Sequence, residues 1–435
     1  IASLKQVIAP IRKLPAELLV QIFLCTIDPY STPLGSSNKD VLVLCGVCAH
    51  WRQLVCTTPQ LWARQLAIKA KKSHSDTYLA IVKTFLERSA PHPIPISLND
   101  EERTASEPLV DFILTLAPRW KSLNFNEISP SKLCQLDSNA LRNPESVDLR
   151  TSNEKLIYGP AVRVFLDAPR LRSVTLEVLS TTRFPMPWSQ LTYLAISEQS
   201  SQLCLDIILQ CINIVTVKFT DMEPWIQPPG LAPIVQLPRL EDLEVAFFES
   251  DGDIVMPFFT RLDLPALRIL NFHPELDSSW SSADFTPFQR RSPNIQELTI
   301  ENCSTLDSAD LICVLQAAPN LVKLDLALCM DCIDDSVFDF LQYSDLDVVH
   351  SVPQLREFQV SYAQDDFEES TLENAILSRW WSNAELLALP LPPGVARWEV
   401  IAVDRGGTSR KKVFSQKFKS MMERLRSQGL QVKIG

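Results

Sequence analysis

Two pairs of cysteines have the spacing that thiol chemistry uses. Cys45 and Cys48 are separated by two residues, as are Cys329 and Cys332, which is the arrangement of a redox-active dithiol or of half a zinc site. No βαβ pattern of the thioredoxin type surrounds either pair, and the two pairs are too far apart in the chain for a local zinc knuckle. We therefore expect no metal site, and we expect the first pair to pack on one helix face beside Trp51.

The other residues that could do chemistry are scattered along the chain. The five histidines show no H-x-x-x-H spacing and lie near no G-x-S-x-G elbow. The turn at 405–408 lacks the lysine of a phosphate-binding P-loop. Acidic pairs such as Asp334 with Asp335 and Asp365 with Asp366 are more typical of a solvated surface than of a carboxylate site. The sequence thus predicts a protein that is not an enzyme and that needs no cofactor.

The composition limits the compartment and the kind of partner. The 435 residues carry a net charge of −11, which argues against the broad basic face that nucleic-acid binding requires. The longest apolar run, Val41–Ala49, is far shorter than the roughly 20 residues that span a bilayer, so we expect no membrane helix. The 11 cysteines lack regular spacing, which favours a reducing compartment, cytoplasmic or nuclear. The chain begins with Ile1 rather than Met, which leaves its native N-terminus open.

An apolar pattern of the form L-x-x-L-x-L recurs along the chain. Successive copies start 20 to 34 residues apart, which is the period of a repeat solenoid. The clear copies are Trp120/Leu123/Phe125, Leu171/Val174/Leu176, Leu191/Leu194/Ile196, Ile214/Val217/Phe219, Leu240/Leu243/Val245, Leu267/Leu270/Phe272, Ile295/Leu298/Ile300, Leu321/Leu324/Leu326 and Leu355/Phe358/Val360, and a weaker one is Pro144/Val147/Leu149. The alternation within each copy predicts one short strand, so the copies should stack into a parallel sheet backed by helices such as Ser308–Gln316.

These copies resemble leucine-rich repeats. The copies that start at Ile295 and Leu321 resemble the cysteine-containing subtype, because Cys303 and Cys329 follow at the matching place. The resemblance implies that both cysteines cap turns from inside the stack. It also implies an α/β solenoid in the form of a horseshoe.

The strand residues that flank the inward apolar ones should point to the concave face of such a stack. Acids outnumber lysines among them, so we expect a protein partner with a basic segment, although a generically acidic surface fits the same pattern. The expected substrate-binding residues are Glu177, Lys218, Asp242, Glu244, Asn271, His273, Glu297, Glu301, Lys323, Asp325 and Glu357.

The N-terminal part of the chain has a different pattern, that of a small helical unit. Apolar residues from Leu14 to Phe23 recur on one side of a helix, and Pro15 suits its first turn. After a polar insertion from Asp28 to Asp40, a second apolar run leads into the segment from Val47 to Trp62. This unit has more apolar surface than its size can bury, which predicts a partner or a neighbouring domain.

Three segments of this unit, L-P-x-E-L-x-x-x-I-F, V-C-x-x-W-R and P-x-L-W, resemble the F-box, and the stretch at 84–98 resembles fungal, basidiomycete-type F-box proteins. The insertion after the first helix departs from the F-box pattern. The resemblance implies a substrate-recognition adaptor of a Skp-cullin ubiquitin ligase, whose head binds a Skp-type protein and through it a cullin. The implied Skp-binding residues are Leu14, Pro15, Leu18, Ile22, Phe23, Val47 and Trp51. The alternative is a binding scaffold that joins no ligase.

The expected fold is therefore α/β, with a short all-helical head before the repeats. The expected domains are an F-box-like head at 1–66, a helical linker and N-terminal cap at 67–115, leucine-rich repeats at 116–390 and a C-terminal cap at 391–435. The cap is predicted from a strand near Trp398, a helix with Phe418 and Met422 on one face, and a last strand near Val432. We expect Arg410, Lys411, Lys412, Lys417 and Lys419 to form the solvated side of that helix, with a nuclear signal as the alternative.

Overall fold

The computed structural model divides the chain into two compact units, Ile1–Pro187 and Trp188–Gly435, which we call the first and the second unit. The residues that the structure describes are 10–27, 40–64, 66–69, 76–99, 107–127, 129–137, 139–150, 161–177, 184–225, 234–248, 255–274, 278–344, 350–361, 367–388, 394–404 and 414–434. The polar insertion at 28–39, the acidic pair at 365–366, the turn at 405–408 and the basic residues at 410–412 therefore lie outside the described residues.

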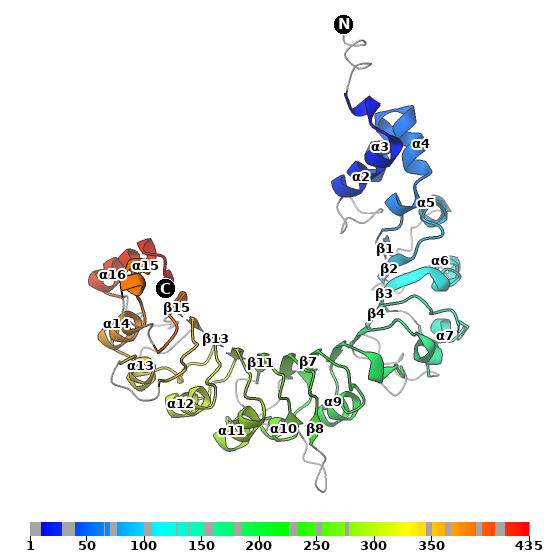
Figure 1. Ribbon diagram of the computed structural model, residues 1–435. Coiled ribbons are helices and arrows are strands. Elements are labelled where there is room, and N and C mark those ends of the chain that lie inside the picture. Colours follow the sequence, from blue (N-terminus) through cyan, green and yellow to red (C-terminus); the bar gives the residue numbers. More distant parts are fainter. Residues whose placement is uncertain are drawn as a thin grey trace. The chain divides into compact units, whose positions relative to one another are not determined.

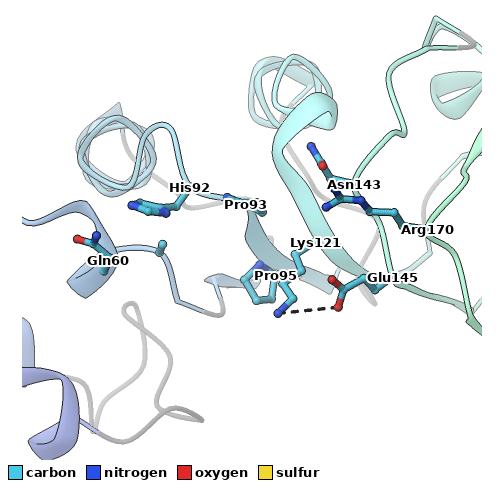
Figure 2. A pocket seen from close by; sticks show the side chains of 9 residues that line it. Gln60, His92, Pro93, Pro95, Lys121, Asn143, Glu145 and Arg170 are labelled. Atoms are coloured by element: carbon cyan, nitrogen blue, oxygen red, sulfur yellow. Dashed lines mark ion pairs between the residues drawn. The ribbon is translucent and has the colours of Figure 1, made fainter.

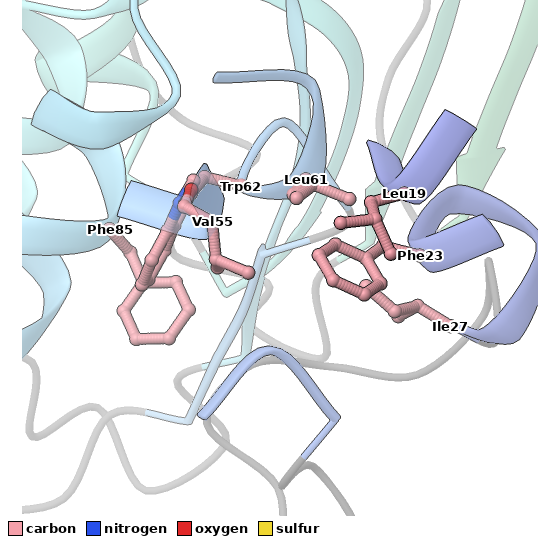
Figure 3. Packing of buried hydrophobic residues seen from close by; sticks show 7 residues of the cluster. All are labelled: Leu19, Phe23, Ile27, Val55, Leu61, Trp62 and Phe85. Atoms are coloured by element: carbon pink, nitrogen blue, oxygen red, sulfur yellow. The ribbon is translucent and has the colours of Figure 1, made fainter. Parts of the chain in front are cut away.

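The first unit begins with a helical head. Its elements are η1 (Pro10–Lys13), α2 (Ala16–Thr26), α3 (Asp40–Val47), α4 (Ala49–Cys56) and η2 (Pro59–Leu61). The core of the head forms where α2 and the residue after it pack against α4, η2 and the residue that follows η2; its members are Leu19, Phe23, Ile27, Val55, Leu61 and Trp62 (Figure 3). The ring of Trp62 meets that of Phe85 in α5 edge-on, at a centroid distance of 4.9 Å. The core of the head is therefore continuous with the elements that follow it.

The rest of the first unit is a parallel sheet with helices. Its strands are β1 (Leu66–Lys69), β2 (Ile94–Asn99), β3 (Trp120–Asn126), β4 (Ser146–Arg150) and β5 (Ser173–Glu177), paired in that order. The helical elements are α5 (Asp76–Arg88), α6 (Glu107–Leu114), η3 (Ala117–Arg119), α7 (Pro130–Leu133) and η4 (Arg163–Asp167). The segment 67–115, which we expected to be helical, thus also supplies strand residues. Its strand β2 escapes the repeat pattern because Pro93 stands where the leading apolar residue would be.

The second unit repeats the same design. Its main sheet orders the strands β6 (Tyr193–Ser197), β7 (Thr216–Met222), β9 (Asp242–Phe247), β11 (Ile269–His273), β12 (Glu297–Glu301), β13 (Lys323–Ala327), β14 (Glu357–Ser361), β15 (Val400–Asp404) and β16 (Gln431–Ile434). Its helical elements are η5 (Trp188–Gln190), α9 (Ser201–Ile208), α10 (Pro257–Thr260), α11 (Ser282–Arg291), α12 (Ser308–Gln316), α13 (Asp335–Leu341), α14 (Glu369–Ser378), α15 (Asn383–Ala388) and α16 (Gln416–Ser427). A separate pair is formed by β8 (Val235–Gln236) and β10 (Leu262–Asp263).

The second unit buries one face of its sheet under helices. Figure 1 shows helices α9 to α14 along one side of strands β7 to β15. Leu270 of β11 pairs with Leu298 of β12, and Leu298 pairs with Leu324 of β13. All three side chains are buried, whereas the residues before and after each of them in its own strand are only half-buried. A strand side chain points to alternate faces, so this register confirms the apolar alternation predicted from the repeats.

An aromatic cluster fills the middle of this core. The ring of Phe259 lies 4.9 Å from that of Phe272, 5.3 Å from that of Phe285 and 5.0 Å from that of Phe288, measured between centroids. The first two contacts are edge-to-face, the geometry that the ring quadrupole favours. These rings come from one strand and two helices, so they join the sheet to its helical cover.

The two cysteines that the repeat resemblance marks as structural are buried. Cys303 and Cys329 are each exposed by 1% or less. The thiol of Cys329 lies 3.5 Å from the carbonyl oxygen of Ile300, which belongs to the preceding strand, and that of Cys332 lies 3.1 Å from the carbonyl oxygen of Cys329. Burial raises the pKa of the Cys303 thiol to about 12. Cys303 and Cys329 are therefore packing groups of the turns, as the resemblance to the cysteine-containing repeats implies.

The C-terminal elements continue the parallel sheet. Strand β16 pairs with β15, which pairs with β14, and α16 buries Phe418, Met422 and Leu425 against them. Ser415 caps this helix, because its hydroxyl accepts a hydrogen bond from the backbone N–H of Phe418 at 3.2 Å. The strands and the helix predicted here from the sequence are present.

In the part of the chain that the structure describes, three arginines join neighbouring repeats by hydrogen bonds to backbone carbonyl groups and form no ion pair with a carboxylate. Arg291 is the last residue of α11, and it donates to the carbonyl oxygens of Phe259 and Thr260 in α10 and of Leu262 in β10 at 3.0 to 3.2 Å. Arg119 donates in the same way to the carbonyl oxygens of Leu86 and His92, which precede β2. The fully buried Arg379 donates to the carbonyl oxygen of Val352, which precedes β14. Burial lowers the pKa of Arg379 to about 10, so the guanidinium stays charged at neutral pH.

We predict that Arg291→Met lowers the free energy of unfolding by about 2–3 kcal/mol, because hydrogen bonds from a charged donor are lost and the carbonyl groups lose their partner. The exposed neighbour Arg290 is the matched control, and Arg290→Met should cost about 0.5 kcal/mol or less. Urea denaturation of the full chain, followed by tryptophan fluorescence, measures both. Equal losses for the two variants would show that the carbonyl contacts of Arg291 contribute nothing.

Candidate protein-interaction surfaces

The head presents two apolar stripes to solvent. On α2, Leu18 and Ile22 lie one turn apart and are 51% and 38% exposed. On α3, Val43 and Val47 lie one turn apart and are 54% and 55% exposed, with Leu42 beside them at 52%. A helix that is apolar on nearly every side, as α3 is, belongs in an interior. We call Leu18, Ile22, Leu42, Val43 and Val47 the head stripes.

The structure separates the predicted Skp-binding residues by exposure. Leu18, Ile22, Val47 and Pro15 are exposed, as a contact surface requires. Leu14 and Trp51 are half-buried, and Phe23 is in the core, where its ring lies 4.6 Å from that of Trp51. Phe23 therefore positions the helix that carries Leu18 and Ile22, while it has no exposed surface of its own.

Leu42 and Val43 are exposed apolar residues that the sequence interpretation did not single out. The signal was present, because both belong to the apolar run that begins at Val41. The half-buried Val41 and Leu44 pack against the core of the head instead. The run alone does not show which of its sides lacks neighbours.

Hydrogen bonds between side chains and the backbone form the connection between α3 and α4. Cys48 is extended, with φ −162° and ψ 168°, and its sulfur accepts a hydrogen bond from the backbone N–H of Trp51 at 3.4 Å. Arg52 donates to the carbonyl oxygen of Cys45 at 2.9 Å, near the end of α3. Cys45 and Cys48 therefore do not share one helix face, which corrects our expectation from the sequence, because α3 ends at Val47 and Cys48 caps the next helix.

The second candidate surface is the open face of the second unit's sheet. Ten of the eleven predicted substrate-binding residues lie on its strands, at the half-buried positions that alternate with the core. Glu297 pairs in register with Lys323, and Lys323 with Glu357. Glu177 belongs to the first unit, where its carboxylate pairs with Arg150 at 3.1 Å.

Ion pairs compensate only part of the charge on this open face. Among the ten residues are six carboxylates and two lysines. Lys218 Nζ lies 2.6 Å from Glu244 Oε2, and His273 Nδ1 lies 3.0 Å from Glu301 Oε2. The face is therefore predominantly acidic. Thr299 and Gln359, which also alternate with buried residues here, are further polar members that the sequence analysis did not name.

Two aspartates of this face are held in unfavourable surroundings. Burial raises the pKa of Asp242, and the neighbouring Glu244 and Glu297 raise it further, while Lys218 opposes them. Burial likewise raises the pKa of Asp325, with Glu301 adding to the rise and Lys323 opposing it. The charged forms of both aspartates are thus disfavoured by the fold.

The helical head is the part of the chain that matches a known protein family. Residues 11–67 match the family model described as F-box-like. This segment is an F-box-like domain, as the sequence predicted, and it supports a general role as an F-box adaptor. No curated protein matches the chain.

Two solved structures are similar to the chain at low identity. The structure of the Rad7–Elc1 complex in yeast matches 85% of this chain and 94% of its own chain, with 15% identity and a TM-score of 0.40. The TLR13–ssRNA13 complex matches 54% of this chain and 42% of its own, with 12% identity and a TM-score of 0.26.

The described residues offer neither a metal-ligand cluster nor a membrane-spanning helix. Within the described residues, no three histidine, cysteine or acidic side chains are grouped so that they could hold a metal ion. In the same part of the chain, every helix is too short or too polar to cross a bilayer.

Because the pKa values of Asp242 and Asp325 are raised, we predict that replacing either aspartate by a neutral residue stabilises the fold, and that this stabilisation depends on pH. A carboxyl group whose folded pKa lies above its unfolded value destabilises the fold above the folded pKa and is neutral below the unfolded one. Asp242→Asn and Asp325→Asn should therefore raise the urea midpoint at pH 7, and the gain should shrink as pH falls toward the ordinary aspartate value of 3.8.

Gln359→Glu is the reverse control, because residue 359 pairs in register with Asp325 and the new carboxylate adds like charge. It should lower the midpoint at pH 7 and do so less at lower pH. If the asparagine variants raised the urea midpoint by the same amount at every pH, the stabilisation would not come from removing the carboxylate charge.

Proposed function

We propose that this protein is the substrate-recognition adaptor of a Skp-cullin ubiquitin ligase. In this proposal the F-box-like head binds a Skp-type protein, and through it a cullin, while the repeats bind a protein substrate. The chain contributes proximity between substrate and ubiquitin-loading enzyme, which needs no catalytic residue of its own. A cytoplasmic or nuclear location fits this role.

The observation that carries the proposal is the pair of head stripes. Leu18 and Ile22 on α2 and Val43 and Val47 on α3 remain exposed although the head has a well-packed core beneath them. Apolar residues exposed at one turn's spacing on two neighbouring helices of the F-box-like domain are typical of a protein interface. A Skp-type partner would cover them.

We predict that Leu18→Asp and Val47→Asp each weaken binding of a purified Skp-type protein by more than about 30-fold, because each buries an unpaired charge in the contact. Ile212→Asp is the matched control, since Ile212 is an exposed apolar residue of the second unit, 62% exposed, and it should bind as the unmodified chain does. Biolayer interferometry measures the affinities, and circular dichroism verifies that the variants are folded.

The outcomes separate the candidate functions. If the unmodified chain does not bind the Skp-type protein, the ligase proposal fails and the non-ligase scaffold takes its place. If binding survives both aspartate substitutions, the head stripes are not the contact.

The open face of the second unit supports a more specific proposal about the substrate, which is that it carries a lysine- or arginine-rich segment. The face exposes carboxylates in register, such as Glu297 and Glu357 with Lys323 between them. Complementary charge speeds encounter and selects partners. Because Glu297 and Glu357 lie on strands two apart, about 10 Å from each other, an extended peptide that crosses the strands with basic residues at three-residue spacing would place them against these carboxylates.

This second proposal predicts that a fluorescent lysine-rich peptide binds the full chain and that Glu297→Gln with Glu357→Gln weakens its binding several-fold in fluorescence anisotropy. The exposed Glu423 of α16 is the control for net charge, and Glu423→Gln should leave the affinity unchanged. An equal loss for the control would reduce the effect to the overall charge of −11.

A further inference from the structure

A pocket of about 420 Å³ lies in the first unit, where the last turn of the head meets the beginnings of the repeat strands. Gln60 and Ala63 line it from the head. Lys121 stands at the start of β3, Glu145 just before β4 and Arg170 a few residues before β5. The pocket therefore follows the edge of the sheet at which its parallel strands begin, and none of the head-stripe residues lines it.

In other repeats, the residue at the position that corresponds to Arg170 is held by a hydrogen bond from its side chain. Arg170 follows Pro169 just before a leading leucine, and Arg239, Asn294 and Asn320 stand at the same place after their prolines. Arg239 donates to Asn213 Oδ1 at 2.7 Å, and Asn294 and Asn320 donate to the carbonyl oxygens of Pro265 and Pro293 at 2.7 and 2.9 Å. These contacts run along the sheet edge and join each repeat to the one before it.

Arg170 departs from this pattern. In the described part of the chain its guanidinium has neither a hydrogen bond nor an ion pair, and it is exposed at the rim of the pocket beside Asn143 (Figure 2). The amide of Asn143 is already used, because it donates to the carbonyl oxygen of Pro118 at 2.7 Å. Five N–H donors of Arg170 are thus available to a ligand.

A second cation faces the same pocket. Lys121 Nζ lies 3.9 Å from Glu145 Oε2, and the two side chains are 53% and 56% exposed (Figure 2). A pair that is this long and this exposed is weak, because water screens it. Lys121 can therefore also bind an incoming anion, and two cations stand against one carboxylate. This balance contrasts with the net charge of −11 of the whole chain.

The opposite side of the pocket is built from rigid and polar groups. Pro93 and Pro95 form an apolar wall near the start of β2, and His92 and Gln60 stand beyond it (Figure 2). The position of His92 is fixed by its backbone, since its carbonyl oxygen accepts hydrogen bonds from Arg119 at 3.2 and 3.0 Å. The wall is thus held by the same kind of arginine contact that joins the turns elsewhere.

We propose that this pocket binds a phosphate ester. The phosphate group would lie between Arg170 and Lys121, where a planar guanidinium can bind two of its oxygens and the ammonium a third. The organic part would lie along Pro93 and Pro95 toward His92 and Gln60. The volume agrees, because about 420 Å³ is within the range of small-ligand sites and exceeds what an isolated ion needs.

The same phosphate chemistry has two sources, a small soluble ester and a phosphorylated side chain of a protein. Isothermal titration of the full chain with phenyl phosphate, and with a phosphoserine hexapeptide, compares them. Phenol and the unphosphorylated peptide are the neutral counterparts. Tighter binding of the phosphopeptide than of phenyl phosphate supports a protein source, and the reverse order supports a small ester.

We predict saturable binding of at least one phosphorylated probe, weakened about 10-fold or more by Arg170→Gln and by Lys121→Gln. Glu145→Gln should strengthen binding several-fold, because it removes the carboxylate that repels the phosphate; a merely structural role for these residues would not produce opposite signs. Arg142→Gln is the matched control, since Arg142 is exposed nearby, does not line the pocket, and donates to Asn139 at 3.3 Å.

Three results would overturn the proposal. They are the absence of saturable binding by every phosphorylated probe, equal binding of the neutral counterparts, and a loss with Arg142→Gln as large as that with Arg170→Gln. Weaker rather than stronger binding by Glu145→Gln would also contradict the charge arrangement. The test does not involve a Skp-type protein, so its result is independent of the ligase proposal.

Discussion

In-register pairing of short parallel strands is the constraint on which the rest of this structure depends. Leu298 is buried between Leu270 and Leu324 because the three strands align without a shift. A slip of one residue in any strand would turn its apolar set toward solvent and bury its polar set. The apolar alternation therefore selects the register, and the register in turn places Glu297 and Lys323 side by side on the other face.

The two faces of the sheet consequently meet different demands. The covered face is buried by helices of the same chain and by aromatic side chains such as that of Phe259. The open face keeps carboxylates such as Asp242 and Asp325 whose surroundings disfavour their charge. The head shows the same division, with Phe23 inside and Leu18 outside. Local rules for stability are broken where a surface is free to bind a partner, which is where such departures are expected in natural proteins.

Sequence reasoning succeeded where the physical signal is local and periodic. An apolar residue at every second position is the signature of a half-covered strand, so even the weak copy at Val147 and Leu149 predicted β4 correctly. The same logic missed β2, in which Pro95 interrupts the pattern and Pro93 replaces its first member. The F-box-like head was found through the resemblance of three short segments to the F-box, and residues 11–67 match that family model.

The remaining features depend on partners distant in sequence. Nothing next to Arg291 in the chain indicates that its guanidinium meets carbonyl groups about 30 residues earlier. Likewise, the run around Leu42 and Val43 is equally apolar whether covered or exposed, and only the packing of α3 shows that these two face outward. Among the described residues, the lack of a partner for the Arg170 guanidinium is informative only in comparison with Arg239, which donates to Asn213 Oδ1. Such properties belong to neighbourhoods in space.

The arginine contacts between turns also determine where this chain can be shortened. Arg379 binds carbonyl groups of Ser351 and Val352, so a fragment that ends between residues 352 and 379 would keep the acceptors and lose their donor. A fragment that begins between them would keep a buried cation without its acceptors. A piece excised from this region should therefore keep the turn at Ser351 and Val352 together with β14, α14 and Arg379.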